Sequence, residues 1–146
     1  MHYIPAGIVA ICTLAITASV SAQPQELLKE SDGMLKKSSL TRFVPSGSKR
    51  IIWFAYAAHP DCSPMGSIDI RTTKTPEHGT ISITPGQGFS NFPSGNPRIR
   101  CNEKKMEGVN VEYQSAEGYT GPDEIDFFII WPNGMAQEAH YTMIVR

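Results

Sequence analysis

The chain has 146 residues, of which 40% are hydrophobic and 18% charged, and its formal net charge at pH 7 is −1. This composition is that of a globular protein with a core. The near-neutral charge, without a long basic run, argues against nucleic acid as a partner.

Residues 1–22 are predicted to be a signal peptide. They contain no Lys, Arg, Asp or Glu, and the apolar run of residues 8–18 is followed by Ser19-Val20-Ser21-Ala22. This pattern fits signal-peptidase cleavage before Gln23 and leaves no membrane span in the mature chain. Because only the α-amino group and His2 supply positive charge ahead of the apolar run, a retained membrane anchor is the alternative. We expect a periplasmic or secreted protein, and a monomer.

The number of cysteines in the mature chain is consistent with export. Cys12 lies in the signal segment, so the mature chain keeps Cys62 and Cys101, for which only one pairing exists. A bond between them would close a loop of about 40 residues and stabilise the fold by roughly 3–4 kcal/mol. The absence of a Cys-x-x-Cys pattern favours a structural bond over a redox-active pair.

Residues 23–40 are polar and interrupted by Ser31-Asp32-Gly33, which predicts a loosely ordered lead-in with one helical turn at most. From residue 41 to 146, runs of β-branched and aromatic residues alternate with turn clusters about every ten residues. That rhythm is typical of an antiparallel β-sandwich of about seven strands. We expect strands at residues 49–58, 67–73, 80–84, 97–102, 109–113, 123–131 and 136–146.

Two connections can be predicted between these strands. Residues 85–97 are rich in Gly, Pro, Ser and Asn and should form a long loop. Asn133-Gly134 predicts a tight hairpin before the last strand, because both residues accept positive φ.

Two segments carry a recognisable pattern. The first is Pro76-Glu77-His78-Gly79-Thr80-Ile81, and the second runs from Tyr113 through Gly118-Tyr119-Thr120-Gly121-Pro122-Asp123 to Phe127. Together they resemble the bacterial Ig-like and cadherin-like repeat domains. The resemblance covers about half of the mature chain and implies an Ig-like sandwich without implying an activity. The repeats usually lack cysteine and occur in tandem, so the pattern looks like a stand-alone exported relative.

The resemblance implies a structural corner between the two sheets. Tyr119 would lie over the edge of the core with its hydroxyl bonded to backbone, Gly121 belongs to the turn, and Asp123 would accept hydrogen bonds from loop amides. Gly79 would supply backbone freedom at the start of its strand. A calcium site using Asp123, Glu124 and Asp126 is the alternative, but it needs six to eight oxygens.

The sequence contains no recognisable catalytic motif. The mature chain has neither a Gly-x-Ser-x-Gly elbow nor a His-Glu-x-x-His motif, and we predict a non-enzymatic protein without a cofactor. His59, His78, His140 and Met65 have ligand types that suit copper or zinc, without a close His-x-His pair. A periplasmic metal-handling protein is therefore the alternative function.

The leading hypothesis is an exported binding module for protein or glycan at the cell envelope or outside it. The candidate surface is the long loop with Phe89 and Phe92, followed by Arg98 and Arg100, since aromatic and guanidinium groups are enriched in binding hot spots. In the alternative interpretation, the two aromatic side chains pack back on the sheet and pin the loop.

Overall fold

The computed structural model describes residues 35–146, so the predicted signal peptide and the first part of the lead-in lie outside the described residues. Seven strands and one short 3₁₀ helix follow one another: β1 (Leu35–Val44), β2 (Lys49–Ala55), β3 (Asp69–Lys74), β4 (Gly79–Phe89), η1 (Ile99–Glu103), β5 (Lys105–Ser115), β6 (Gly121–Ile130) and β7 (Ala136–Val145). Within residues 35–146, no helix has the length and apolar character needed to span a membrane.

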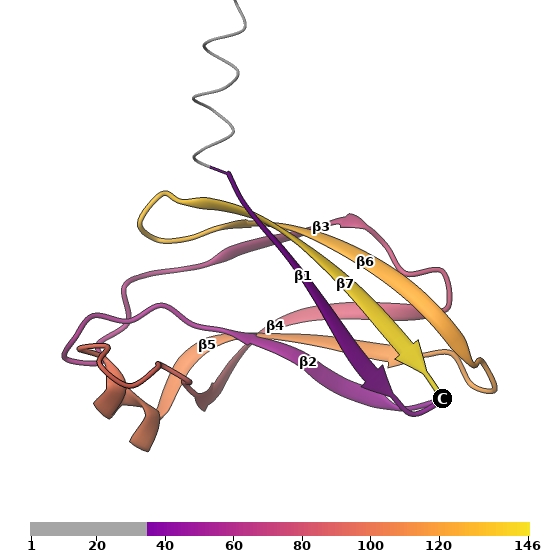
Figure 1. The fold of residues 1–146 in the computed structure, drawn as a ribbon, viewed down its shortest axis with the longest axis horizontal. Helices are drawn as coiled ribbons and strands as arrows, with labels where there is room; N and C mark the ends of the chain where they lie inside the picture. Colours follow the sequence, from indigo (N-terminus) through magenta and orange to yellow (C-terminus); the bar gives the residue numbers. More distant parts are fainter. Residues whose placement is uncertain (1–34) are drawn as a thin grey trace, which may run out of the picture.

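The strands form two layers that face each other (Figure 1). One sheet has the order β1-β7-β6-β3 and the other the order β2-β5-β4. The strand groups β7-β6-β3 and β2-β5-β4 match the G-F-C and B-E-D groups of an Ig-like sandwich, whereas β1 joins β7 instead of β2. The predicted fold class is confirmed. The pairing is antiparallel except between β1 and β7, which run parallel, so the sandwich is not antiparallel throughout.

The sandwich begins earlier than predicted. β1 starts at Leu35 and pairs with β7 from Leu35↔Ala136 to Val44↔Val145. Residues 35–40 therefore belong to the sheet and not to a loosely ordered lead-in. The alternation was hidden in the sequence because polar side chains share the inner face of β1 with Leu40 and Val44. One of them, Arg42, donates its Nε–H to the carbonyl of Ile52 in β2, 3.1 Å away.

The segment predicted as a strand at 97–102 is wrong. Residues 99–103 form η1, whose Cys101 is completely buried. The preceding strand is instead longer than expected, because β4 continues through Pro85 and Gly86 and stays paired with β5 as far as Phe89↔Lys105. The long loop thus starts at residue 90.

The hairpin between β6 and β7 is present at the predicted place. The Trp131 amide donates to the carbonyl of Met135, and the Gly134 amide donates to the carbonyl of Trp131. Only Gly134 has a positive φ, of 82°, whereas the prediction assigned this conformation to Asn133 as well. The geometry is that of a longer hairpin loop with a glycine at its end.

The core lies between the layers and is rich in aromatic residues. Tyr141 of β7 is packed edge-on against Phe127, with ring centroids 5.6 Å apart, and tilted against Trp53 of the opposite sheet at 6.5 Å. Its burial raises the pKa of Tyr141 to about 12. Burying each large apolar side chain stabilises the fold by roughly 1.5–3 kcal/mol. The other fully buried large side chains include Tyr113, Ile125, Ile129, Met143, Val44, Val111 and Val145.

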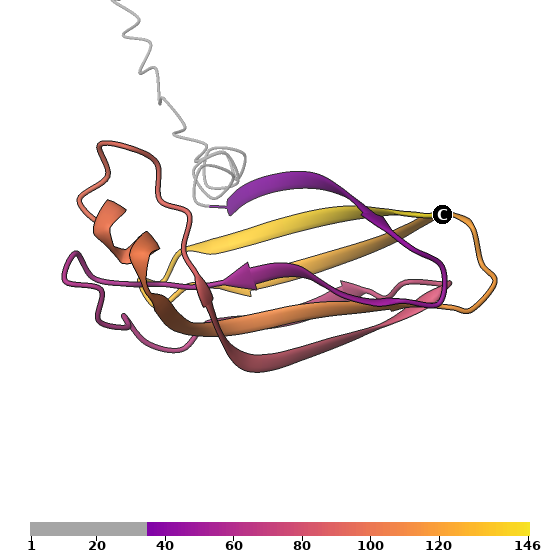
Figure 2. The ribbon, with the colours of Figure 1, turned by 90° about the horizontal axis from the view of Figure 1, so that it is seen from below.

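The connections gather at the two ends of the sandwich (Figure 2). Residues 56–68, 90–104 and 131–135 lie at one end, called the loop end below; residues 45–48, 75–78 and 116–120 lie at the other, called the corner end. Of the candidate binding residues, Phe92, Arg98 and Arg100 belong to the loop end, and Phe89 is the last residue of β4 next to it. The predicted structural corner comprises Tyr119 of the corner end and the first residues of β6 next to it.

Candidate functional site

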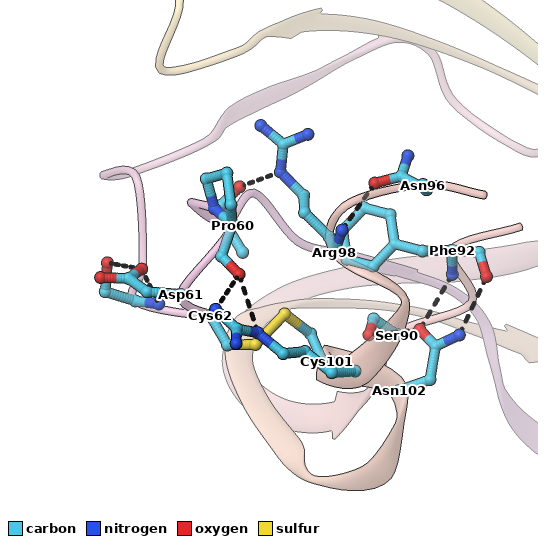
Figure 3. The surroundings of a disulfide bond; sticks show 12 residues. Pro60, Asp61, Cys62, Ser90, Phe92, Asn96, Arg98, Cys101 and Asn102 are labelled. Atoms are coloured by element: carbon cyan, nitrogen blue, oxygen red, sulfur yellow. Dashed lines mark hydrogen bonds between the residues drawn. A yellow bond between two sulfur atoms is a disulfide. The ribbon is translucent and has the colours of Figure 1, made fainter. Parts of the chain in front are cut away.

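At the loop end, a disulfide joins two connections that are distant in sequence (Figure 3). Cys62 of the β2–β3 connection is bonded to Cys101 of η1, with a Cα–Cα distance of 5.5 Å. The predicted pairing is therefore confirmed. Cys101 is fully buried, and together with Ala58 and Met106 it forms a second hydrophobic cluster, separate from the main core.

The turn that presents Cys62 is held by its own hydrogen bonds. Cys62 has a φ of 71°, unusual for a residue other than glycine, and its amide donates to the carbonyl of His59. The Asp61 carboxylate accepts hydrogen bonds from the Ser63 hydroxyl and amide, and these bonds lower the pKa of Asp61. The turn is thus fixed by local polar contacts as well as by the disulfide.

Both candidate arginines hold the two connections together. Arg98 donates its Nε–H to the carbonyl of Ala58 at 2.5 Å, and Arg100 donates from Nε and Nη2 to the carbonyl of Pro60 at 3.2 and 3.0 Å (Figure 3). Because these guanidinium groups bind backbone oxygens of the same chain, their first role is to stabilise the loop end.

The two candidate phenylalanines have different environments. Phe92 is half-buried, edge-on to Tyr56 with ring centroids 5.2 Å apart, and its backbone is held by the Asn102 side chain. The Tyr56 hydroxyl in turn accepts a hydrogen bond from the amide of Asn91. Phe89 is instead 59% exposed. Of the four predicted binding residues, the structure thus ties Phe92, Arg98 and Arg100 into the loop assembly and leaves Phe89 free for contact.

Two further exposed apolar residues lie at the loop end. Ile99, the first residue of η1, is 43% exposed, and Met135 in the β6–β7 hairpin is 50% exposed. Sequence reasoning missed both. The sequence pattern predicts a strand around Ile99, and a single methionine after a turn carries no signal of exposure.

At the corner end, Tyr119 and Asp123 make the contacts predicted for them. The Tyr119 hydroxyl donates to the carbonyl of Pro122 at 2.6 Å. Asp123 is 4% exposed and accepts hydrogen bonds from the amides of Glu77 and His78 and from the Tyr113 hydroxyl, at 2.9–3.0 Å. Desolvation, with a smaller contribution from Asp123, raises the pKa of Tyr113. The carboxylate therefore links the turn before β4 to the start of β6.

Gly121 and Gly79 are required for different structural reasons. Gly121 has a φ of 139°, and a Cβ there would lie 2.8 Å from the Tyr119 hydroxyl oxygen. Gly79 has no positive φ. Instead, a Cβ at this position would lie 2.3 Å from the Tyr113 ring, so close approach and not backbone freedom requires the glycine.

The three histidines are not brought together. His59 lies in the β2–β3 turn, His78 stacks on the Tyr119 ring at 3.8 Å, and His140 pairs with Asp126 on the outer face of its sheet. Across the described residues 35–146, no group of three or more His, Cys, Asp or Glu side chains could hold a metal ion.

One arrangement of chemically active groups was not foreseen. Asp126 Oδ1 lies 2.6 Å from His140 Nδ1, and His140 Nε2 lies 3.4 Å from the Thr142 hydroxyl. Acid, imidazole and hydroxyl follow in the order of a catalytic triad. The hydroxyl contact is long, however, and the group lies on the outer face of a sheet, where water reaches it. We assign it no reaction.

No family model matches the chain, and no curated protein matches it either. Among solved structures, the chain is similar to one titled "Solution Structure of Amebosin", with a TM-score of 0.36 and 13% sequence identity, covering 76% of this chain and 98% of that chain. A likeness at this level carries no argument about function.

Proposed function

We propose that the chain is an exported, non-catalytic Ig-like module that binds a protein partner at the cell envelope or outside it through its loop end. The proposal places the chain beside the bacterial Ig-like and cadherin-like repeat domains that its sequence elements resemble. Fold-level analogy of this kind does not specify a ligand, and the support for binding comes from the loop end itself.

Export is supported by two features. The uncharged segment of residues 1–22 has the pattern of a signal peptide, and the cysteines that remain beyond it, Cys62 and Cys101, are paired in a disulfide. Structural disulfides form and persist in oxidising compartments, such as the periplasm and the extracellular space.

The observation that carries the proposal is the rigid attachment of exposed apolar side chains. The disulfide and the two arginine–carbonyl contacts fix η1 to the β2–β3 connection, while Ile99 of η1 stays 43% exposed. Phe89, the last residue of β4, is held by the pairing of its strand with Lys105 of β5 and stays 59% exposed. Binding through a surface that is already ordered costs less conformational entropy than binding through a mobile loop. Apolar side chains of this kind favour a protein ligand over a glycan.

The test is capture of a partner from envelope extract by the purified protein and by two variants. The double variant Phe89→Ser/Ile99→Ser removes exposed apolar groups from the loop end. Ile51→Ser removes one that is 55% exposed on β2, outside the loop end, and serves as the matched control. We expect the wild type and the control to retain a partner that the double variant loses.

Treating the extract with protease beforehand should abolish the capture. Capture that survives protease would identify a glycan ligand and refute the protein assignment. Capture that is equal for all three proteins would refute the role of the loop end. No described feature favours the copper or zinc alternative, because the three histidines lie on separate parts of the sandwich.

A further inference from the structure

An open cleft of about 770 Å³ lies near the loop end, between the β2-β5-β4 sheet and the β2–β3 connection. One wall is formed by β4 and β5 at residues 85–87 and 107–109, and the other by Ala57, Pro64 and residues 66–68 of the β2–β3 connection. Its volume lies in the range of roughly 300–1,000 Å³ that is usual for ligand pockets.

The cleft lies where the inward-facing side chains of β4 and β5 change from apolar to polar. Val111 and Tyr113 of β5 are completely buried, and since side chains alternate along a strand, Val109 and Glu107 point to the same inner side. On β4, Gln87 is the direct cross-strand partner of Glu107. An amide and a carboxylate thus stand where the preceding inner positions carry apolar groups, and Glu107 is exposed to solvent.

The chemistry of the walls restricts the ligand. Ile68, Pro85 and Val109 contribute apolar surface to the lining, which also includes three glycines, Gly66, Gly86 and Gly108. Glu107 is the one charged side chain that lines the cleft, and none of the ion pairs of residues 35–146 involves it. A lysine or arginine side chain matches these features, because its aliphatic stem covers apolar surface while its charged head stays at the rim.

We propose that this cleft accepts a lysine or arginine side chain, carried on an extended segment of the partner, with its charge paired to Glu107. The inference rests on the proposed function, since the segment belongs to the protein that the loop end binds. The competing explanation is that Glu107 is an inward charge that only discourages edge-to-edge association of sheets. In that case the cleft would show no preference for a basic ligand.

The test uses two small probes that differ only in the terminal ammonium group: N-acetyl-lysine methylamide and N-acetyl-norleucine methylamide. Each is titrated into ¹⁵N-labelled protein while the amide resonances of Gly66, Gly86 and Gly108 are followed. We expect saturable shifts at these glycines and about fivefold tighter binding of the lysine probe, since an exposed ion pair contributes up to about that factor.

Two variants complete the design. Glu107→Gln keeps the shape of the side chain and should weaken the lysine probe to the level of the norleucine probe. Glu117→Gln removes an exposed carboxylate at the corner end and should leave both affinities unchanged. Equal affinities of the two probes for the wild type, or no saturable shift at the three glycines, would overturn the inference.

The two proposals fail separately. The probes bind without any partner, so loss of the probe effect with continued dependence of partner capture on Phe89 and Ile99 removes only the cleft assignment. A lysine preference that depends on Glu107, together with capture that ignores Phe89 and Ile99, removes only the role of the loop end.

Discussion

The disulfide should contribute a large share of the stability of this domain. Cys62 and Cys101 are separated by 39 residues, and the chain-entropy relation for a loop of this length gives about 4 kcal/mol at 25 °C. The double variant Cys62→Ala/Cys101→Ala removes the bond without burying a hydroxyl at position 101, where the side chain is completely enclosed. Since a domain is typically stable by only 5–15 kcal/mol, the loss would be readily measured.

Urea unfolding followed by tryptophan fluorescence is the appropriate assay. Trp53 and Trp131 lie edge-on with ring centroids 6.1 Å apart, so both report on the packed interior. With a denaturant slope of about 2 kcal/mol per molar urea, the midpoint should fall by about 2 M. Reduction of the wild type with dithiothreitol should produce a similar shift, whereas the double variant should not respond to the reductant.

A wild-type midpoint that does not respond to reductant would refute this role of the disulfide, because the bond would then contribute nothing. It would also be refuted by a double variant within about 0.5 M of the wild type. In that case the arginine–carbonyl contacts alone would hold the loop end, and the loop-closure calculation would not apply to this protein.

Three further predictions concern the corner end and the outer face of a sheet. Asp123→Asn should lower the free energy of unfolding by about 3 kcal/mol in the same assay, because two backbone amides and the Tyr113 hydroxyl lose charged acceptors; an unchanged midpoint would contradict this role. Gly79→Ala should destabilise by about 2 kcal/mol, since its Cβ would overlap the Tyr113 ring, and the double variant with Tyr113→Leu should recover part of the loss. The Lys49 ammonium lowers the pKa of Glu112, so this pair stabilises the fold above the unfolded pKa near 4.5 and the contribution disappears as pH falls through the folded pKa. Glu112→Gln should therefore reduce the stability difference between pH 7 and pH 3, and an unaltered pH profile would count against the pair.

The alternating runs of β-branched and aromatic residues indicated the sheet class correctly, since this alternation follows from strand geometry and needs no distant partner. The corner at Tyr119 and Asp123 was predicted from the resemblance to the Ig-like repeats. The Tyr119 hydroxyl bonds within its own connection, whereas the Asp123 carboxylate binds amides of the distant turn before β4. The disulfide could be predicted because only two cysteines remained. The strand predicted around Cys101 failed for a complementary reason. Its residues form the 3₁₀ helix η1 instead, and the disulfide bonds this helix to Cys62, 39 residues away.

Other features were decided by contacts between distant segments. Arg98 and Arg100 looked like a binding surface, but the carbonyls that they bind belong to residues 58 and 60, and only the folded chain brings these together. β1 was hidden because its polar inner residues are accommodated by other strands. The sequence by itself therefore determined the fold class and the covalent cross-link, because both depend on local alternation and on counting. The tertiary structure alone decided which side chains face solvent at the loop end, because exposure depends on what the rest of the chain leaves uncovered.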